Sequence, residues 1–107
     1  MASKILHATD QTFGSLVQKG VALVDFYADW CGPCRMLSPI IESLAEKHHK
    51  SMNFVKVDTE NCQKVAQEHS ISSLPTLLLF KDGALINRSV GLRDEESLES
   101  LLKKHMA

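Results

Sequence analysis

The sequence lacks the features that mark several classes of protein. Its 12 Lys and Arg are balanced by 13 Asp and Glu, for a formal net charge of -1. It therefore lacks the basic excess of a nucleic-acid-binding protein. Its apolar runs, such as Leu77 to Phe80, are too short to cross a bilayer, and no signal-peptide core follows Met1. We expect a cytoplasmic protein that binds neither nucleic acid nor membranes.

The chain is also too short for two hydrophobic cores, with 107 residues. Hydrophobic residues make up 44% and charged residues 23%, which is ordinary for a globular protein. A disordered chain would have lower hydrophobicity and a higher net charge. We expect one domain over residues 1–107, acting as a monomer.

Cysteine is scarce and odd in number, since there are three. A fully paired disulfide framework is therefore impossible, and buried thiols, metal ligands or redox catalysts remain. A structural zinc ion needs four ligands, usually from two cysteine pairs. Only Cys31 and Cys34 form such a pair, so we expect no metal site. Cys62 is interpreted as a small buried residue, with a regulatory thiol as the alternative.

Apolar patterns predict nine elements in the order β-α-β-α-β-α-β-β-α. The expected strands cover Ser3–Leu6, Val21–Ala28, Asn53–Asp58, Thr76–Phe80 and Leu85–Val90. The expected helices begin after Asp10, after the Cys31–Cys34 pair, at Cys62 and after Asp94, with the two aspartates as N-caps. The αβ alternation indicates parallel strands, and Asp82-Gly83 indicates an antiparallel hairpin. We expect an α/β protein with a mixed sheet and helices on both faces.

Cys31 and Cys34 lie between an expected buried strand and the start of an expected helix. Positions i and i+3 are neighbours on a helix, within the Cα separation that a disulfide tolerates. Pro33 suits the first helical turn. The first-turn amides and the helix dipole lower the pKa of the Cys31 thiol. We expect Cys31 to be the nucleophile, and the deeper, less exposed Cys34 to resolve the mixed disulfide.

The motif Trp30-Cys31-Gly32-Pro33-Cys34 resembles the active site of the thioredoxin family. Further matching segments follow in order, namely 24–28, 54–58, 74–76, 80–83 and 90–91. The resemblance covers essentially the whole chain and implies the thioredoxin fold, a central mixed five-stranded β-sheet flanked by four α-helices. It also implies a protein disulfide reductase that acts on disulfide-containing proteins. Its disulfide would be reduced again by thioredoxin reductase, which carries the flavin and nicotinamide, so no cofactor is expected in this chain.

Asp25 interrupts an otherwise apolar strand. A buried carboxylate must be paired or have its pKa raised by desolvation. Lys56 lies on a strand expected beside it, which allows a structural ion pair, or it is a solvated strand residue. The resemblance favours another role, in which Asp25 exchanges a proton with Cys34 through water and Lys56 is its partner.

The resemblance also implies a substrate-binding surface. It would be formed by Trp30, Leu74, Pro75, Thr76, Gly91 and Leu92. Trp30 could instead be a core aromatic residue. Leu92 stands where the family often has a small residue. The Leu74–Pro75 bond is expected to be cis, with Pro75 facing Cys31 and the Leu74 backbone free to pair with an extended substrate.

Two other functions compete with reduction. An oxidase or isomerase uses the same chemistry, and the two residues between the cysteines tune its poise. Oxidising relatives commonly carry His there, whereas Gly32 and Pro33 resemble the reducing members. A non-catalytic subunit would use the same groove only to hold partners, and would not need the cysteines.

Overall fold

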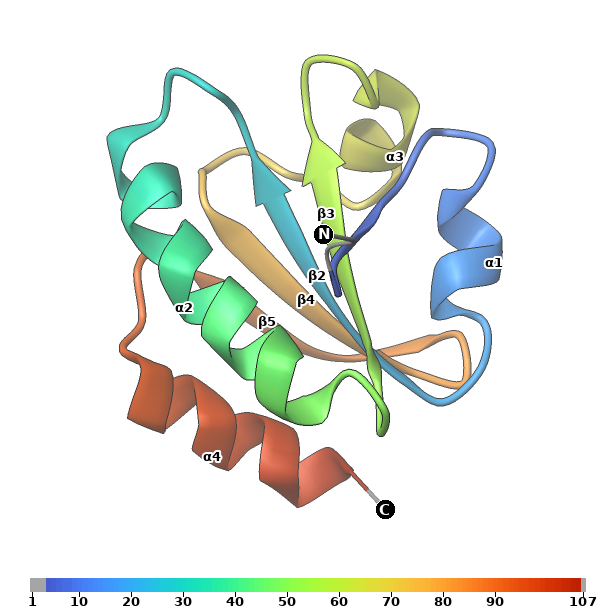
Figure 1. Cartoon of the computed structure of the whole chain (residues 1–107). Coiled ribbons are helices and arrows are strands. Elements are labelled where there is room, and N and C mark those ends of the chain that lie inside the picture. Colours follow the sequence, from blue (N-terminus) through green and yellow to red (C-terminus); the bar gives the residue numbers. More distant parts are fainter. Residues whose placement is uncertain (1–3, 107) are drawn as a thin grey trace.

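Five strands and four helices follow one another in the predicted order in the computed structural model, which describes residues 4–106 (Figure 1). The strands are β1 (Leu6–His7), β2 (Val21–Tyr27), β3 (Asn53–Asp58), β4 (Thr76–Lys81) and β5 (Ala84–Val90). The helices are α1 (Phe13–Val17), α2 (Gly32–His48), α3 (Gln63–Glu68) and α4 (Glu95–His105). The first strand overlaps its predicted range only at Leu6 and extends one residue beyond it; Ser3 is outside the described residues.

The sheet is mixed, as predicted, with the strand order β1-β3-β2-β4-β5. β3 pairs in parallel with β1 and β2, whereas β4 pairs antiparallel to β2 and β5. Asp82 and Gly83 form the β4–β5 turn with φ values of 50° and 86°, the left-handed backbone of a two-residue hairpin. The carboxyl ends of β2 and β3 meet at one edge, where their loops lead to α2 and α3 (Figure 1).

Two apolar clusters cover the two faces of the sheet. Helices α2 and α4 pack on one face through residues such as Leu37, Ile41 and Leu98. Helix α1 supplies Phe13 to the cluster on the other face. Side chains of β2 alternate between the clusters: residues 21 and 23 join the first, and residues 22, 24 and 26 the second. The alternation therefore turns Asp25 toward the α2 face.

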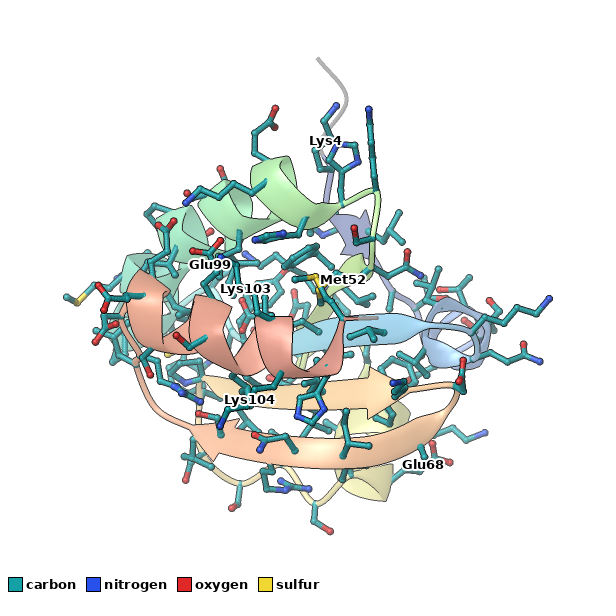
Figure 2. All side chains as sticks on the ribbon, turned by 90° about the horizontal axis from the view of Figure 1, so that it is seen from below. Lys4, Met52, Glu68, Glu99, Lys103 and Lys104 are labelled. Carbon is teal, nitrogen blue, oxygen red and sulfur yellow. A yellow bond between two sulfur atoms is a disulfide. The ribbon has the colours of Figure 1, made fainter. Side chains whose placement is uncertain are left out.

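Helices α2 and α4 are tied together at their polar rims. The Lys47 ammonium donates to Glu95 at 2.9 Å, and the His48 ring contacts the Glu99 carboxylate at 2.6 Å. Figure 2 shows Glu99 and Lys103 on the side of α4 toward α2. None of the described helices is long and apolar enough to cross a membrane.

The predicted N-cap of the first helix is wrong. Thr12 occupies the N-cap position of α1, and its side chain makes no capping hydrogen bond. Asp10 instead accepts a hydrogen bond at 3.0 Å from the Val65 amide, in the first turn of α3. A carboxylate serves any helix N-terminus that it can reach, and here the tertiary contact prevailed. Cys62 is buried, as predicted, but it lies just before α3 and not within it, with its thiol 3.3 Å from the Ala8 carbonyl.

The predicted N-cap of α4 is confirmed, and its removal should weaken the fold. Asp94 accepts a hydrogen bond from the Ser97 amide at 2.8 Å. We expect Asp94→Ala to lower the free energy of unfolding by about 1 kcal/mol, because it leaves that amide without its acceptor. Urea denaturation measures the loss. Asp94→Asn keeps an acceptor oxygen and should recover most of it; equal losses in both variants would contradict the capping role.

Candidate active site

A disulfide between Cys31 and Cys34 lies at the N-terminus of helix α2. Their Cα atoms are 5.3 Å apart, as the helical spacing predicted. Cys31 is the N-cap, with extended backbone, and the Cys34 amide points to its sulfur at 3.2 Å. Pro33 lies in the first helical turn and Gly32 begins it, so the missing proline N–H costs no helical hydrogen bond. A backbone amide dipole therefore faces the first sulfur, as a thiolate there would require.

The two cysteines are equally buried in this oxidised state, each with 4% exposure. The prediction that Cys34 is the less exposed is therefore wrong for the disulfide form. The bond itself explains the result, because each sulfur covers part of the other.

Asp25 is buried on the α2 side of the sheet, with 1% exposure. Neither of its carboxylate oxygens has a hydrogen-bond partner among residues 4–106. Burial raises the pKa of Asp25 to about 6 from an ordinary 3.8, and the positive charge of Lys56 opposes part of that rise. The group therefore changes protonation near physiological pH.

Lys56 pairs with Asp25 in the β2–β3 register, as predicted, but makes no hydrogen bond to it. Its ammonium donates to the Ser38 hydroxyl at 3.3 Å and lies 4.5 Å from the centre of the Tyr27 ring. The structural ion-pair interpretation of Asp25 therefore finds no direct contact here. A cavity of about 220 Å³ is lined by Tyr27, Ser38 and Lys56 together with Cys34. The cavity therefore brings Cys34 together with Lys56, the register neighbour of Asp25, although Asp25 itself does not line it.

Trp30 is an exposed residue, at 66%, so its interpretation as a core aromatic is wrong. Its indole N–H donates to Glu60 at 3.1 Å, which holds the ring at the surface beside the disulfide loop. Trp30 and Leu74 line a concavity of about 250 Å³ together with Thr59, Ile71 and Ser72. Sequence reasoning missed Glu60 and these last three residues, because they lie in loops that no periodic pattern covers.

The Leu74–Pro75 bond is cis, as the resemblance implied. Neither backbone polar group of Leu74 has a partner within the described chain. The Pro75 carbonyl accepts from the Gly91 amide at 2.9 Å, and Gly91 has a φ of 93°, which favours glycine. These contacts bring the loop before β4 beside the loop after β5.

Two further residues of the predicted surface differ in exposure. Leu92 is exposed, at 45%. Thr76 is buried, and its hydroxyl donates to the Ser73 carbonyl at 2.6 Å. The Thr76 side chain therefore stabilises the turn before β4 and does not reach the surface.

A redox-active disulfide at a helix N-terminus, beside an exposed tryptophan, is typical of one class of protein, the thiol–disulfide oxidoreductases. Comparisons with known proteins narrow the class. The profile of the Thioredoxin family matches residues 4–104. Thioredoxin of Bacillus subtilis is 41% identical over 102 residues, covering 95% of this chain and 98% of that protein. Thioredoxin of Chlamydia trachomatis is 46% identical over 98 residues, covering 91% and 94%.

A solved structure agrees with these relatives. A mutant thioredoxin from Halobacterium salinarum superposes with a TM-score of 0.90 at 36% identity, covering all of this chain (100%) and 96% of that one. The chain belongs to the thioredoxin family and has the thioredoxin fold. Its function is the reduction of protein disulfides, carried by a redox-active cysteine pair.

Proposed function

We propose that this chain is a monomeric, single-domain reductase in which Cys31 attacks the substrate and Cys34 completes the reaction. The Cys31 thiolate attacks one sulfur of a substrate disulfide, which forms a mixed disulfide and releases the other substrate sulfur as a thiolate. The Cys34 thiolate then attacks the Cys31 sulfur and releases the second substrate thiol. Two electrons pass to the substrate, and the Cys31–Cys34 disulfide forms. The assignment is supported by the Cys34 amide that faces the Cys31 sulfur.

Asp25 is the proposed proton acceptor for Cys34. With a pKa of about 6, its carboxyl is mostly ionised at pH 7 and can take the thiol proton by way of water. Cys34 lines the same cavity as Lys56, the register neighbour of Asp25, which supports such a path. Lys56 is the proposed partner that favours the ionised carboxylate. When the disulfide is reduced again, the same carboxyl returns the proton to the Cys34 sulfur.

The proposed substrate surface surrounds the disulfide. Trp30, Leu74 and Leu92 offer apolar contacts to the substrate, and the unpartnered backbone of Leu74 can pair with an extended segment. Pro75 and Gly91 hold the two loops together, and Thr76 supports the turn from within. Backbone pairing is indifferent to side chains, which suits a reductase of many proteins. Gly32 and Pro33, which lie between the two cysteines, favour a reduction potential that suits a reductase.

The proposed partners are a thioredoxin reductase and disulfide-containing proteins, and the proposed location is the cytoplasm. Family membership is the observation that carries this proposal. The test is a coupled assay with NADPH, a bacterial thioredoxin reductase and insulin, in which we expect NADPH oxidation and insulin precipitation that depend on this protein. The variant with both cysteines changed to Ser is the control. A folded wild-type protein that performs no better than this control would contradict the reductase proposal.

A further inference from the structure

The Lys56 side chain is held away from the carboxyl that it influences. Its backbone lies beside Asp25 in the sheet, yet its ammonium donates to Ser38 at 3.3 Å on helix α2. The Tyr27 ring covers the ammonium at 4.5 Å, a distance typical of a cation–π contact. A lysine side chain has many rotamers in water, so two contacts from different elements restrict it considerably.

Ser38 connects this ammonium to a second charge. Its hydroxyl lies 3.4 Å from the carboxylate of Glu42, one turn further along α2. A hydroxyl has one hydrogen and two lone pairs, so it can donate to Glu42 while it accepts from Lys56. The acid strengthens the hydroxyl as an acceptor, because hydrogen bonds in a chain polarise one another. Ser38 is half-buried at the cavity that Cys34 and Lys56 also line.

We propose that Ser38 is a positioning residue for the proton transfer at this site, because its hydroxyl fixes the Lys56 ammonium near the Asp25 carboxyl without allowing contact. The proposal deepens the function proposed above, since it rests on Asp25 as the proton acceptor of Cys34. Direct contact would require both charged groups to lose their hydration. The attraction between buried charges seldom compensates for that loss of hydration energy. A lysine released from Ser38 would therefore turn toward solvent. Its stabilising effect on the ionised carboxylate would then decrease.

No other cation has the same access to Asp25 in the described part of the chain. On strand β4, apolar Leu77 is its register partner. Arg35 lines the cavity from α2, but its guanidinium donates to the Asp29 carbonyl at 3.1 Å. The other titratable groups nearby are Cys34 on α2, Tyr27 on β2, Asp29 after β2 and, beside Lys56 in the register, His7 on β1. The pKa of Asp25 is lowered only by Lys56 among these charges.

The test measures the Asp25 carboxyl directly. Carbon-13 NMR follows its titration in the oxidised protein, where the disulfide cysteines do not titrate. We expect Ser38→Ala to raise the pKa of Asp25, by less than Lys56→Met does. Ser38→Thr keeps a hydroxyl and should restore the wild-type value. In the Lys56→Met background, Ser38→Ala should cause no further change, because the ammonium that it positions is gone.

Ser43→Ala is the matched control, because Ser43 is another half-buried serine of α2 whose hydroxyl bonds to Glu95 instead. It should leave the titration unchanged. An Asp25 pKa that stays at the wild-type value in Ser38→Ala, or effects of Ser38→Ala and Lys56→Met that simply add, would overturn the proposal. In the insulin assay, the acidic limb of the pH profile should move upward with the Asp25 pKa. If the Asp25 pKa shifts but the pH profile of insulin reduction does not, the result would contradict the proton-transfer role of Asp25. It would also contradict the effect of Ser38 on catalysis.

Discussion

Cys34→Ser is expected to accumulate a covalent complex with substrate through Cys31. Once Cys31 has attacked, only Cys34 is positioned to release the substrate, since the two Cα atoms are 5.3 Å apart at the start of α2. Cys31→Ser should form no such complex. In each variant, reduction of insulin should fall by roughly 10³-fold or more, because each removes one of the two steps of exchange.

Mass spectrometry of complexes trapped with a disulfide-containing substrate identifies the cysteine that carries the adduct. Both variants retain Cys62, which is buried and therefore serves as an internal control for unspecific reaction. Adducts on Cys34 in the Cys31→Ser protein, together with none on Cys31 in the Cys34→Ser protein, would reverse the two assignments. Adducts on Cys62 at a similar level would show that the trapping is unspecific.

Asp25→Ala is expected to stabilise the fold at neutral pH while it slows turnover. The folded state holds the Asp25 proton more tightly than the unfolded state, because burial raises the pKa to about 6 from 3.8. The protonated Asp25 therefore contributes fully to the free energy of unfolding below pH 3.8. This one contribution is lost as the pH rises to about 6. One pKa unit corresponds to about 1.36 kcal/mol, so the ionised carboxylate costs about 3 kcal/mol above pH 7.

Urea denaturation at pH 4 and pH 8 separates this effect from packing. Asp25→Ala should gain about 1–3 kcal/mol at pH 8, reduced by the small cavity that the substitution leaves, and should gain nothing at pH 4. Asp29→Ala is the control, since Asp29 is an exposed aspartate just beyond the same strand. A clear loss of stability for Asp25→Ala at pH 8 would indicate that Lys56 pairs with the carboxylate and that Asp25 is structural.

Local patterns sufficed for most of the fold. The near-continuous apolar run of residues 21–28 predicts a strand buried on both faces, and β2 lies in the centre of the sheet. The cysteine pair could be recognised equally well, because residues 31–34 are contiguous in the sequence and form a single turn at the start of a helix. Asp25 could be singled out because a carboxylate within an apolar strand has few explanations.

The role that was wrong and the residues that were missed depend on contacts between distant segments. Asp10 precedes an amphipathic segment, as an N-cap should, yet its bond is to Val65, 55 positions away. Glu60 is an ordinary loop acid until the fold places it 3.1 Å from the Trp30 indole. Ser38 looks like any polar position on a helix, and only the β3 strand beneath it supplies the ammonium that gives its hydroxyl a role.

The two edges of the sheet offer very different lengths of unpaired backbone. β1 closes one edge with two residues, whereas β5 closes the other with seven, and Leu85, Ile86 and Val90 of β5 are exposed. An open edge strand is a template on which another chain can add a strand, so aggregation at high concentration should begin along β5. The exposed charge of Arg88 and the register shift between Leu79 and Phe80 oppose it. Colloidal stability of this protein therefore depends on its last strand, and Arg88 is the residue whose neutral replacement should lower its solubility.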